Sequence, residues 1–96
     1  MNTPQDKKEI ECIITGRVQL VMFRDFATRR GRRLHLAGTV QNLPDGSVLV
    51  VAQGTEDKLA KFIELLKKGP ILSEVEKVQV AWREPGAALA DFKILN

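Results

Sequence analysis

The segment from Thr55 to Gly69 has the pattern of an amphipathic helix and constrains the rest of the chain. Thr55 is placed to cap its start, and Gly69 followed by Pro70 ends it. Its apolar residues recur at helical spacing and predict one buried face: Leu59, Phe62, Ile63 and Leu66. Such a face must pack against another element. In a chain of 96 residues, one core has to serve all elements.

The flanking segments predict the elements that share this core. Glu9–Thr15 and Glu74–Trp82 alternate apolar and polar residues as strands do, whereas Phe23–Leu34 has helical spacing. Ala37–Gly54 holds Pro-Asp-Gly between two apolar, β-branched stretches, which is typical of a hairpin. The short apolar segment Phe92–Leu95 is a candidate edge strand.

This order of elements is β-α-β-β-α-β and predicts an α+β fold. We expect a ferredoxin-like sandwich: an antiparallel sheet of four to five strands with two helices on one face. We expect a single domain at residues 9–96, preceded by a flexible amino-terminal extension at residues 1–8. The fold alone does not give the function, because enzymes, RNA binders and regulatory modules share it.

Composition excludes several classes of protein. The single cysteine, Cys12, rules out an intramolecular disulfide and any cysteine-based zinc pattern. No apolar run approaches the roughly 18 residues of a membrane span, and the polar amino terminus does not resemble a signal peptide. We therefore expect a cytoplasmic location. The net charge of +3 is modest, and the run Arg29–Arg33 fits a solvated helix face, an anion-attracting field or a nucleic-acid patch.

The loop Gly16–Arg24, with the sequence GRVQLVMFR, is the main candidate for a functional site. It leads into the amino end of the first predicted helix, where unpaired N–H groups attract anions. The loop holds no proline, so its backbone N–H groups stay available, and Arg24 adds a guanidinium suited to phosphate. The alternative is a buried turn followed by a surface arginine. The residues alone leave both interpretations open.

Three motifs in this chain resemble the acylphosphatase family. GRVQLVMFR is similar to that family's loop G-R-V-Q-G-V-x-F-R. At matching spacing, LAGTVQNLPDGSV resembles its L-x-G-x-V-x-N followed by D-G-x-V, and KKGP with VEKVQV resembles its later segment. The similarity covers the chain from about Glu11 to Ile94, and the fold that it implies is the ferredoxin-like one.

The resemblance implies hydrolysis of a carboxyl-phosphate mixed anhydride to a carboxylate and inorganic phosphate. Arg24 would bind the phosphoryl oxygens, and the Asn42 side-chain amide would orient the attacking water. Backbone amides of the loop would hold the phosphate, namely those of Arg17, Val18, Gln19, Leu20, Val21 and Met22. The resemblance implies a small-molecule substrate, no metal, no cofactor, no nucleic acid and no membrane. We also expect a monomer.

The loop departs from the family motif at Leu20, where glycine is usual. If φ is positive there, leucine costs about 1–2 kcal/mol in strain. If the loop instead follows a different path, its affinity for phosphate is weakened or altered. This departure keeps open a second function: a non-catalytic relative that binds an anion or a partner. A third is an RNA-binding module. It would need aromatic side chains on the central strands, and Glu9–Thr15 and Ser47–Gln53 contain none.

Three further residues have ordinary structural interpretations. We expect Cys12 to be a small buried apolar side chain, because no base is identifiable beside it. His35 is expected at the end of the first helix without a catalytic partner. Asp45 is expected to be a turn residue.

Overall fold

The computed structural model describes residues 6–96 and contains a five-stranded sheet with two helices. The elements are β1 (Lys8–Arg17), α1 (Phe23–Arg33), β2 (Ala37–Asn42), β3 (Val48–Gly54), α2 (Glu56–Lys68), β4 (Glu74–Arg83) and β5 (Phe92–Ile94). The predicted order and the edge strand near the carboxyl end are confirmed. Of the flexible extension expected at residues 1–8, residues 1–5 lie outside the described part, and β1 begins at Lys8.

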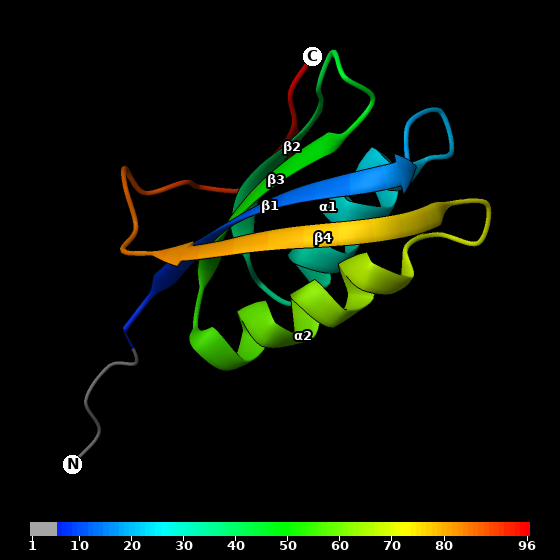
Figure 1. The fold of residues 1–96 in the computed structure, drawn as a ribbon. Coiled ribbons are helices and arrows are strands. Elements are labelled where there is room, and N and C mark those ends of the chain that lie inside the picture. The colour runs from blue at the N-terminus through cyan, green and yellow to red at the C-terminus, as the bar shows by residue number, and fades with distance from the viewer. Residues whose placement is uncertain (1–5) are drawn as a thin grey trace.

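The strands lie in the order β4-β1-β3-β2-β5, with both helices on one face of the sheet (Figure 1). The strands β4, β1, β3 and β2 pair with one another in antiparallel fashion, whereas β5 pairs with β2 in parallel. Because β1 and β2 both run antiparallel to β3, their carboxyl ends lie at the same end of the sheet. The loop after β1, the β2–β3 turn and the carboxyl terminus all lie at that end (Figure 1).

The core lies between the sheet and the two helices. Alternate residues of β1 point into it, as the pattern of Glu9–Thr15 predicts, and alternate residues of β3 do the same. The helices contribute the apolar stripes expected from their spacing. The largest fully buried side chains are Phe23, Phe62, Phe92, Ile10, Ile14, Leu59 and Leu66. This packing fixes the ends of β1 and β2, from which the site is built.

The edge strand β5 is held against α1 and α2 by Phe92. A Cβ atom at Gly31 would overlap the Phe92 ring, so α1 needs glycine there despite its low helix propensity. The ring also packs edge-on against Phe62, with 5.5 Å between ring centroids. Beyond the strand, the N–H of Leu95 donates to the carbonyl of Val40 at 2.8 Å. The last residues are thereby held beside the carboxyl end of β2.

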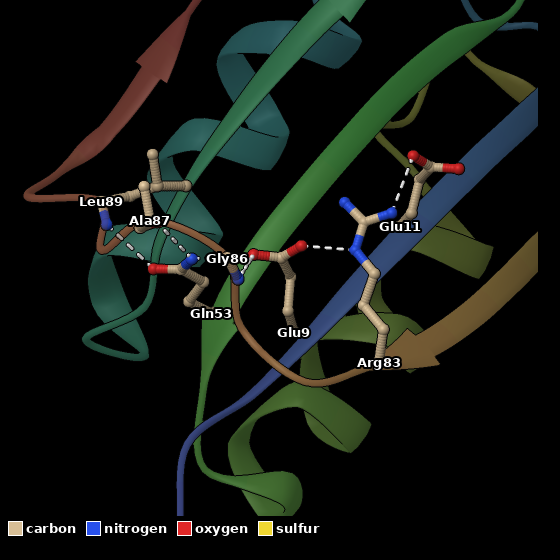
Figure 2. A network of polar contacts seen from close by, with 7 residues as sticks. All are labelled: Glu9, Glu11, Gln53, Arg83, Gly86, Ala87 and Leu89. Atoms are coloured by element: carbon tan, nitrogen blue, oxygen red, sulfur yellow. Dashed lines mark hydrogen bonds and ion pairs between the residues drawn. The ribbon is translucent and has the colours of Figure 1, made fainter.

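A polar network at the opposite end of the sheet anchors the connection from β4 to β5 (Figure 2). The buried Glu9 carboxylate accepts hydrogen bonds from Gln53, at 2.7 Å, and from Arg83. The network reaches three backbone groups of the connection: the N–H of Gly86, the carbonyl of Ala87 and the N–H of Leu89. Burial raises the pKa of Glu9, but the hydrogen bonds from Gln53 and Arg83 outweigh it and hold that pKa below its ordinary value.

The start of α2 differs in detail from the expectation. Thr55 occupies the N-cap position with an extended backbone, as predicted. Its hydroxyl, however, donates to the Asp57 carboxylate at 2.7 Å and does not accept from a backbone N–H. Neither helix within residues 6–96 has the length and hydropathy that crossing a membrane requires.

Candidate active site

The loop that follows β1 begins at a fixed turn. Gly16 has φ 123°, and a Cβ there would overlap the carbonyl of Glu74 in β4, so only glycine fits. Arg17 pairs with Glu74 across the two strands, and their side chains form an ion pair at 3.0 Å. Val18 is then buried in the core. The carboxyl end of β1 is thus tied to the sheet before the chain turns toward α1.

The backbone of the loop alternates between left-handed and ordinary conformations. Leu20 has φ 62° and Met22 has φ 65°, whereas Val21 between them has negative φ. Alternation of this kind turns successive N–H groups toward one side and forms an anion-binding concavity. Within residues 6–96, the N–H groups of residues 18–25 have no hydrogen-bond acceptor; the first paired amide of α1 is that of Phe26. The loop and the helix start therefore offer a set of free donors.

Leu20 is strained and exposed at the same time. Its side chain is 97% exposed, so it gains no burial that would offset a strain of about 1–2 kcal/mol. A positive φ at Leu20 is the condition under which the sequence predicts this strain. Met22 is also left-handed and its side chain is 68% exposed, and no feature of the sequence predicts that conformation.

A cavity of about 450 Å³ lies between the loop, the start of α1, the end of β2 and the carboxyl-terminal segment. It brings together Arg24 and Asn42, the two side chains that the sequence motifs assign to one site. The complete lining is Val18, Leu20, Met22, Phe23, Arg24, Asp25, Asn42, Ile94 and Asn96. The volume lies within the range of small-molecule pockets.

Arg24 is the second residue of α1 and lines this cavity. Arg17 and Arg29 are both neutralised, by Glu74 at 3.0 Å and by Asp25 at 3.1 Å. For Arg24, no ion pair occurs within residues 6–96. A guanidinium beside the free amides of a helix start makes this end of the cavity positive, which favours an anion.

Asn42 is the last residue of β2, and its side-chain oxygen Oδ1 is buried. Among the described residues, this oxygen has no hydrogen-bond partner. A buried acceptor without a partner costs about 1–3 kcal/mol, and such groups in native proteins commonly serve a ligand, a water or a catalytic step. Asn42 thus lines the same cavity as Arg24 and holds, just beneath the cavity surface, a buried oxygen that has no partner within residues 6–96.

The side chain of Gln19 ties the loop to the turn that follows Asn42. Its amide nitrogen donates to the carbonyl of Leu43 and to that of Ser47, both at 2.8 Å. The turn is itself closed by the Asp45 carboxylate, which accepts from the N–H of Ser47 at 3.0 Å and from its hydroxyl at 2.6 Å. Gln19 therefore fixes the distance between the loop and Asn42.

The structure places the predicted site residues in two groups. Those lining the cavity are Val18, Leu20, Met22, Arg24 and Asn42. Those outside its lining are Arg17, in β1, and Gln19 and Val21, in the loop. Four further lining residues were not predicted from the sequence: Phe23, Asp25, Ile94 and Asn96. Only the parallel pairing of β5 with β2 brings the last two here, and no short motif signals it.

The residues given ordinary structural interpretations behave as expected. Cys12 is fully buried, and burial raises the pKa of its thiol to about 12, so it is no nucleophile at neutral pH. His35 lies just after α1 with φ 59° and outside the cavity lining, and Asp45 closes the turn. Within residues 6–96, no group of three or more His, Cys, Asp or Glu side chains is arranged to hold a metal ion.

Comparison with known proteins identifies the family. The acylphosphatase family model matches residues 10–94. The chain is 46% identical to the acylphosphatase of Helicobacter hepaticus over 95 residues, covering 94% of this chain and 99% of that one. It is 43% identical to the acylphosphatase of Salinibacter ruber over 88 residues, covering 92% and 93%. The crystal structure of acylphosphatase from Bacillus subtilis superposes with a TM-score of 0.90 at 34% identity, covering 93% of this chain and 99% of that one. The chain belongs to the acylphosphatase family.

Proposed function

We propose that this protein hydrolyses acyl phosphates to a carboxylate and inorganic phosphate. The observation that carries the proposal is the meeting of Arg24, Asn42 and the free loop amides at one cavity. Family membership supports the same reaction, because the relatives are acylphosphatases.

In the proposed complex, the phosphoryl group is held by the loop. The backbone amides of residues 17–22 donate to its oxygens. For residues 18–22 this is supported by the lack of any acceptor for these amides within residues 6–96. Arg24 grips two oxygens with its planar guanidinium and offsets charge as the bond to the leaving carboxylate breaks. These donors are fixed before the substrate arrives, because β1 and α1 hold both ends of the loop.

Asn42 orients the water that attacks phosphorus. Its Oδ1 accepts a hydrogen bond from the water, which supplies the partner that this buried oxygen lacks within the described chain. The water oxygen forms the new bond to phosphorus, and the bond from phosphorus to the carboxylate oxygen breaks with its electron pair on the carboxylate. Because an asparagine is not a base at neutral pH, the water's proton passes to a phosphate oxygen of the substrate.

This reaction can proceed by positioning and electrostatic stabilisation, because an acyl phosphate already carries a good leaving group. The proposal therefore includes no metal, no cofactor and no covalent intermediate. We further propose that residues 9–96 work as a single domain, that the protein acts as a monomer in the cytoplasm, and that its partner is a small acyl phosphate and not a nucleic acid.

The test is hydrolysis of benzoyl phosphate in ¹⁸O-labelled water with a chelator present. The proposal predicts turnover above the uncatalysed rate, with one ¹⁸O in the phosphate and none in the benzoate. Label in the benzoate would contradict attack at phosphorus. No turnover with the wild type or with Leu20→Gly, which relieves the strain at the loop, would favour a non-catalytic domain that binds an anion or a partner.

A further inference from the structure

Three apolar side chains border the candidate active-site cavity on its solvent side. Leu20 is 97% exposed, Met22 68% and Ile94 41%, and all three belong to the cavity lining. They come from the loop after β1, from the start of α1 and from β5. Below them, Val18 and Phe23 continue the apolar wall into the core.

The cavity is too large for a phosphoryl group alone. A water molecule takes about 30 Å³, and a phosphoryl group displaces the volume of only a few waters. The cavity measures about 450 Å³. Most of it therefore remains free for the part of a substrate that is attached to the phosphate, and Leu20, Met22 and Ile94 are the exposed apolar side chains of the lining.

The charges of the cavity lining indicate which acyl groups the cavity can hold. Arg24 is the one lysine or arginine among the residues that line the cavity, and in the proposed reaction the phosphoryl group takes it. The neighbouring charged side chain, Asp25, is negative and already paired with Arg29 at 3.1 Å. An acyl group with a second negative charge would meet no cation here, whereas an uncharged apolar group would cover the exposed leucine and methionine.

The backbone conformation of Leu20 and Met22 supports a role for their side chains in binding a substrate. Leu20 and Met22 both hold left-handed conformations that disfavour side-chain-bearing residues, and both are largely exposed. In the free protein neither exposed side chain gains much by burial. A bound apolar group would bury both at once.

We propose that Leu20, Met22 and Ile94 form the binding surface for the acyl group, and that the preferred substrates are acyl phosphates with an uncharged, apolar acyl group. This inference rests on the proposed function and adds the substrate class. Leu20 is its main determinant, because it is the most exposed of the three.

The test compares three substrates that share the reacting group: benzoyl, 4-carboxybenzoyl and acetyl phosphate. For the wild type, kcat/KM should be at least about 10-fold higher for benzoyl phosphate than for the other two, in the range that one well-placed apolar contact supplies. Ratios between substrates are the readout, since any change in phosphate binding by the loop cancels in them.

Leu20→Asn and Met22→Asn keep a residue that tolerates left-handed backbone but remove the apolar surface. Each should reduce the preference for benzoyl over 4-carboxybenzoyl phosphate by about 3- to 10-fold, mainly through KM. Ile71→Asn is the matched control, because Ile71 is also 97% exposed but does not line the cavity. It should leave the ratios unchanged.

Two results would overturn the inference: equal kcat/KM for the neutral and the anionic aromatic substrate in the wild type, or ratios in both loop variants equal to those of the wild type. In either case the three substrates are still hydrolysed and the proposed function stands. If the wild type hydrolyses none of them, the proposed function itself is wrong.

Discussion

The side-chain nitrogen of Gln19 lies 2.8 Å from the carbonyl oxygen of Leu43, the residue that follows Asn42. This contact joins the loop that is proposed to hold the phosphate to the strand end that is proposed to hold the water. The same nitrogen donates to Ser47 at 2.8 Å, so the amide of Gln19 spans the turn. The sheet places the ends of β1 and β2, and this one side chain then holds the loop against the turn that follows β2.

Gln19→Met keeps the size of the side chain and removes both hydrogen bonds. We expect kcat to fall by about 10- to 100-fold, because a displacement on the order of 1 Å between catalytic groups has effects of that size. The inhibition constant of inorganic phosphate should change much less, since Arg24 and its helix stay in place. Gln79→Met makes the same chemical change at an exposed position of β4 and should leave kcat unaltered. Equal kcat for the two variants would refute the positioning role of Gln19.

Glycine should stabilise two exposed left-handed positions, Leu20 and His35. Leu20→Gly and His35→Gly relieve a strain of about 1–2 kcal/mol each, less about 0.5–1 kcal/mol for the added freedom of glycine in the unfolded chain. The free energy of unfolding measured in urea should therefore rise by up to about 1.5 kcal/mol for either variant. Ile71→Gly, at an exposed residue with negative φ, should lower it. A loss of stability in both Leu20→Gly and His35→Gly would disprove the strain.

The Glu9 network should make stability depend on pH. Because the pKa of Glu9 is lower in the folded protein than its ordinary value of 4.5, its ionised form stabilises the fold above that pH. This contribution is lost as the pH falls through the folded-state pKa. Glu9→Gln should reduce the free energy of unfolding at pH 7 by about 1–3 kcal/mol, and the difference from the wild type should shrink below pH 4.5.

Urea unfolding of both proteins between pH 3 and pH 7 measures this difference. Glu76→Gln is the control, because Glu76 is exposed and forms no ion pair within residues 6–96. A difference between wild type and Glu9→Gln that stays constant with pH would rule out the ionised carboxylate as its cause.

The fold could be predicted because each element carries its own local signal. The stripe from Leu59 to Leu66 and the Pro-Asp-Gly turn depend only on neighbours in the sequence. The parallel pairing of β5 depends instead on distant contacts. Phe92 packs on Gly31 and Phe62, and nothing in a three-residue strand reveals these partners.

The candidate site could also be predicted only where local motifs signal its residues. Arg24 and Asn42 follow from motifs, and the strand order then brings them to one cavity. The side-chain contacts of Gln19 with Leu43 and Ser47 could not be read from the sequence, because the same residue in a free loop would face water. The left-handed backbone of Met22 was likewise hidden, since methionine gives no sign of it.

The central claim is that Arg24 binds the phosphoryl group whereas Asn42 orients the attacking water. One set of measurements tests it most directly. For the wild type, Arg24→Ala and Asn42→Ala, kcat for benzoyl phosphate and the inhibition constant of inorganic phosphate are determined in chelator. Arg24→Ala should weaken phosphate binding and lower kcat, and Asn42→Ala should lower kcat by about 100- to 1,000-fold while phosphate inhibits nearly as well as in the wild type. Wild-type kcat in Asn42→Ala, or undiminished phosphate inhibition in Arg24→Ala, would contradict the account.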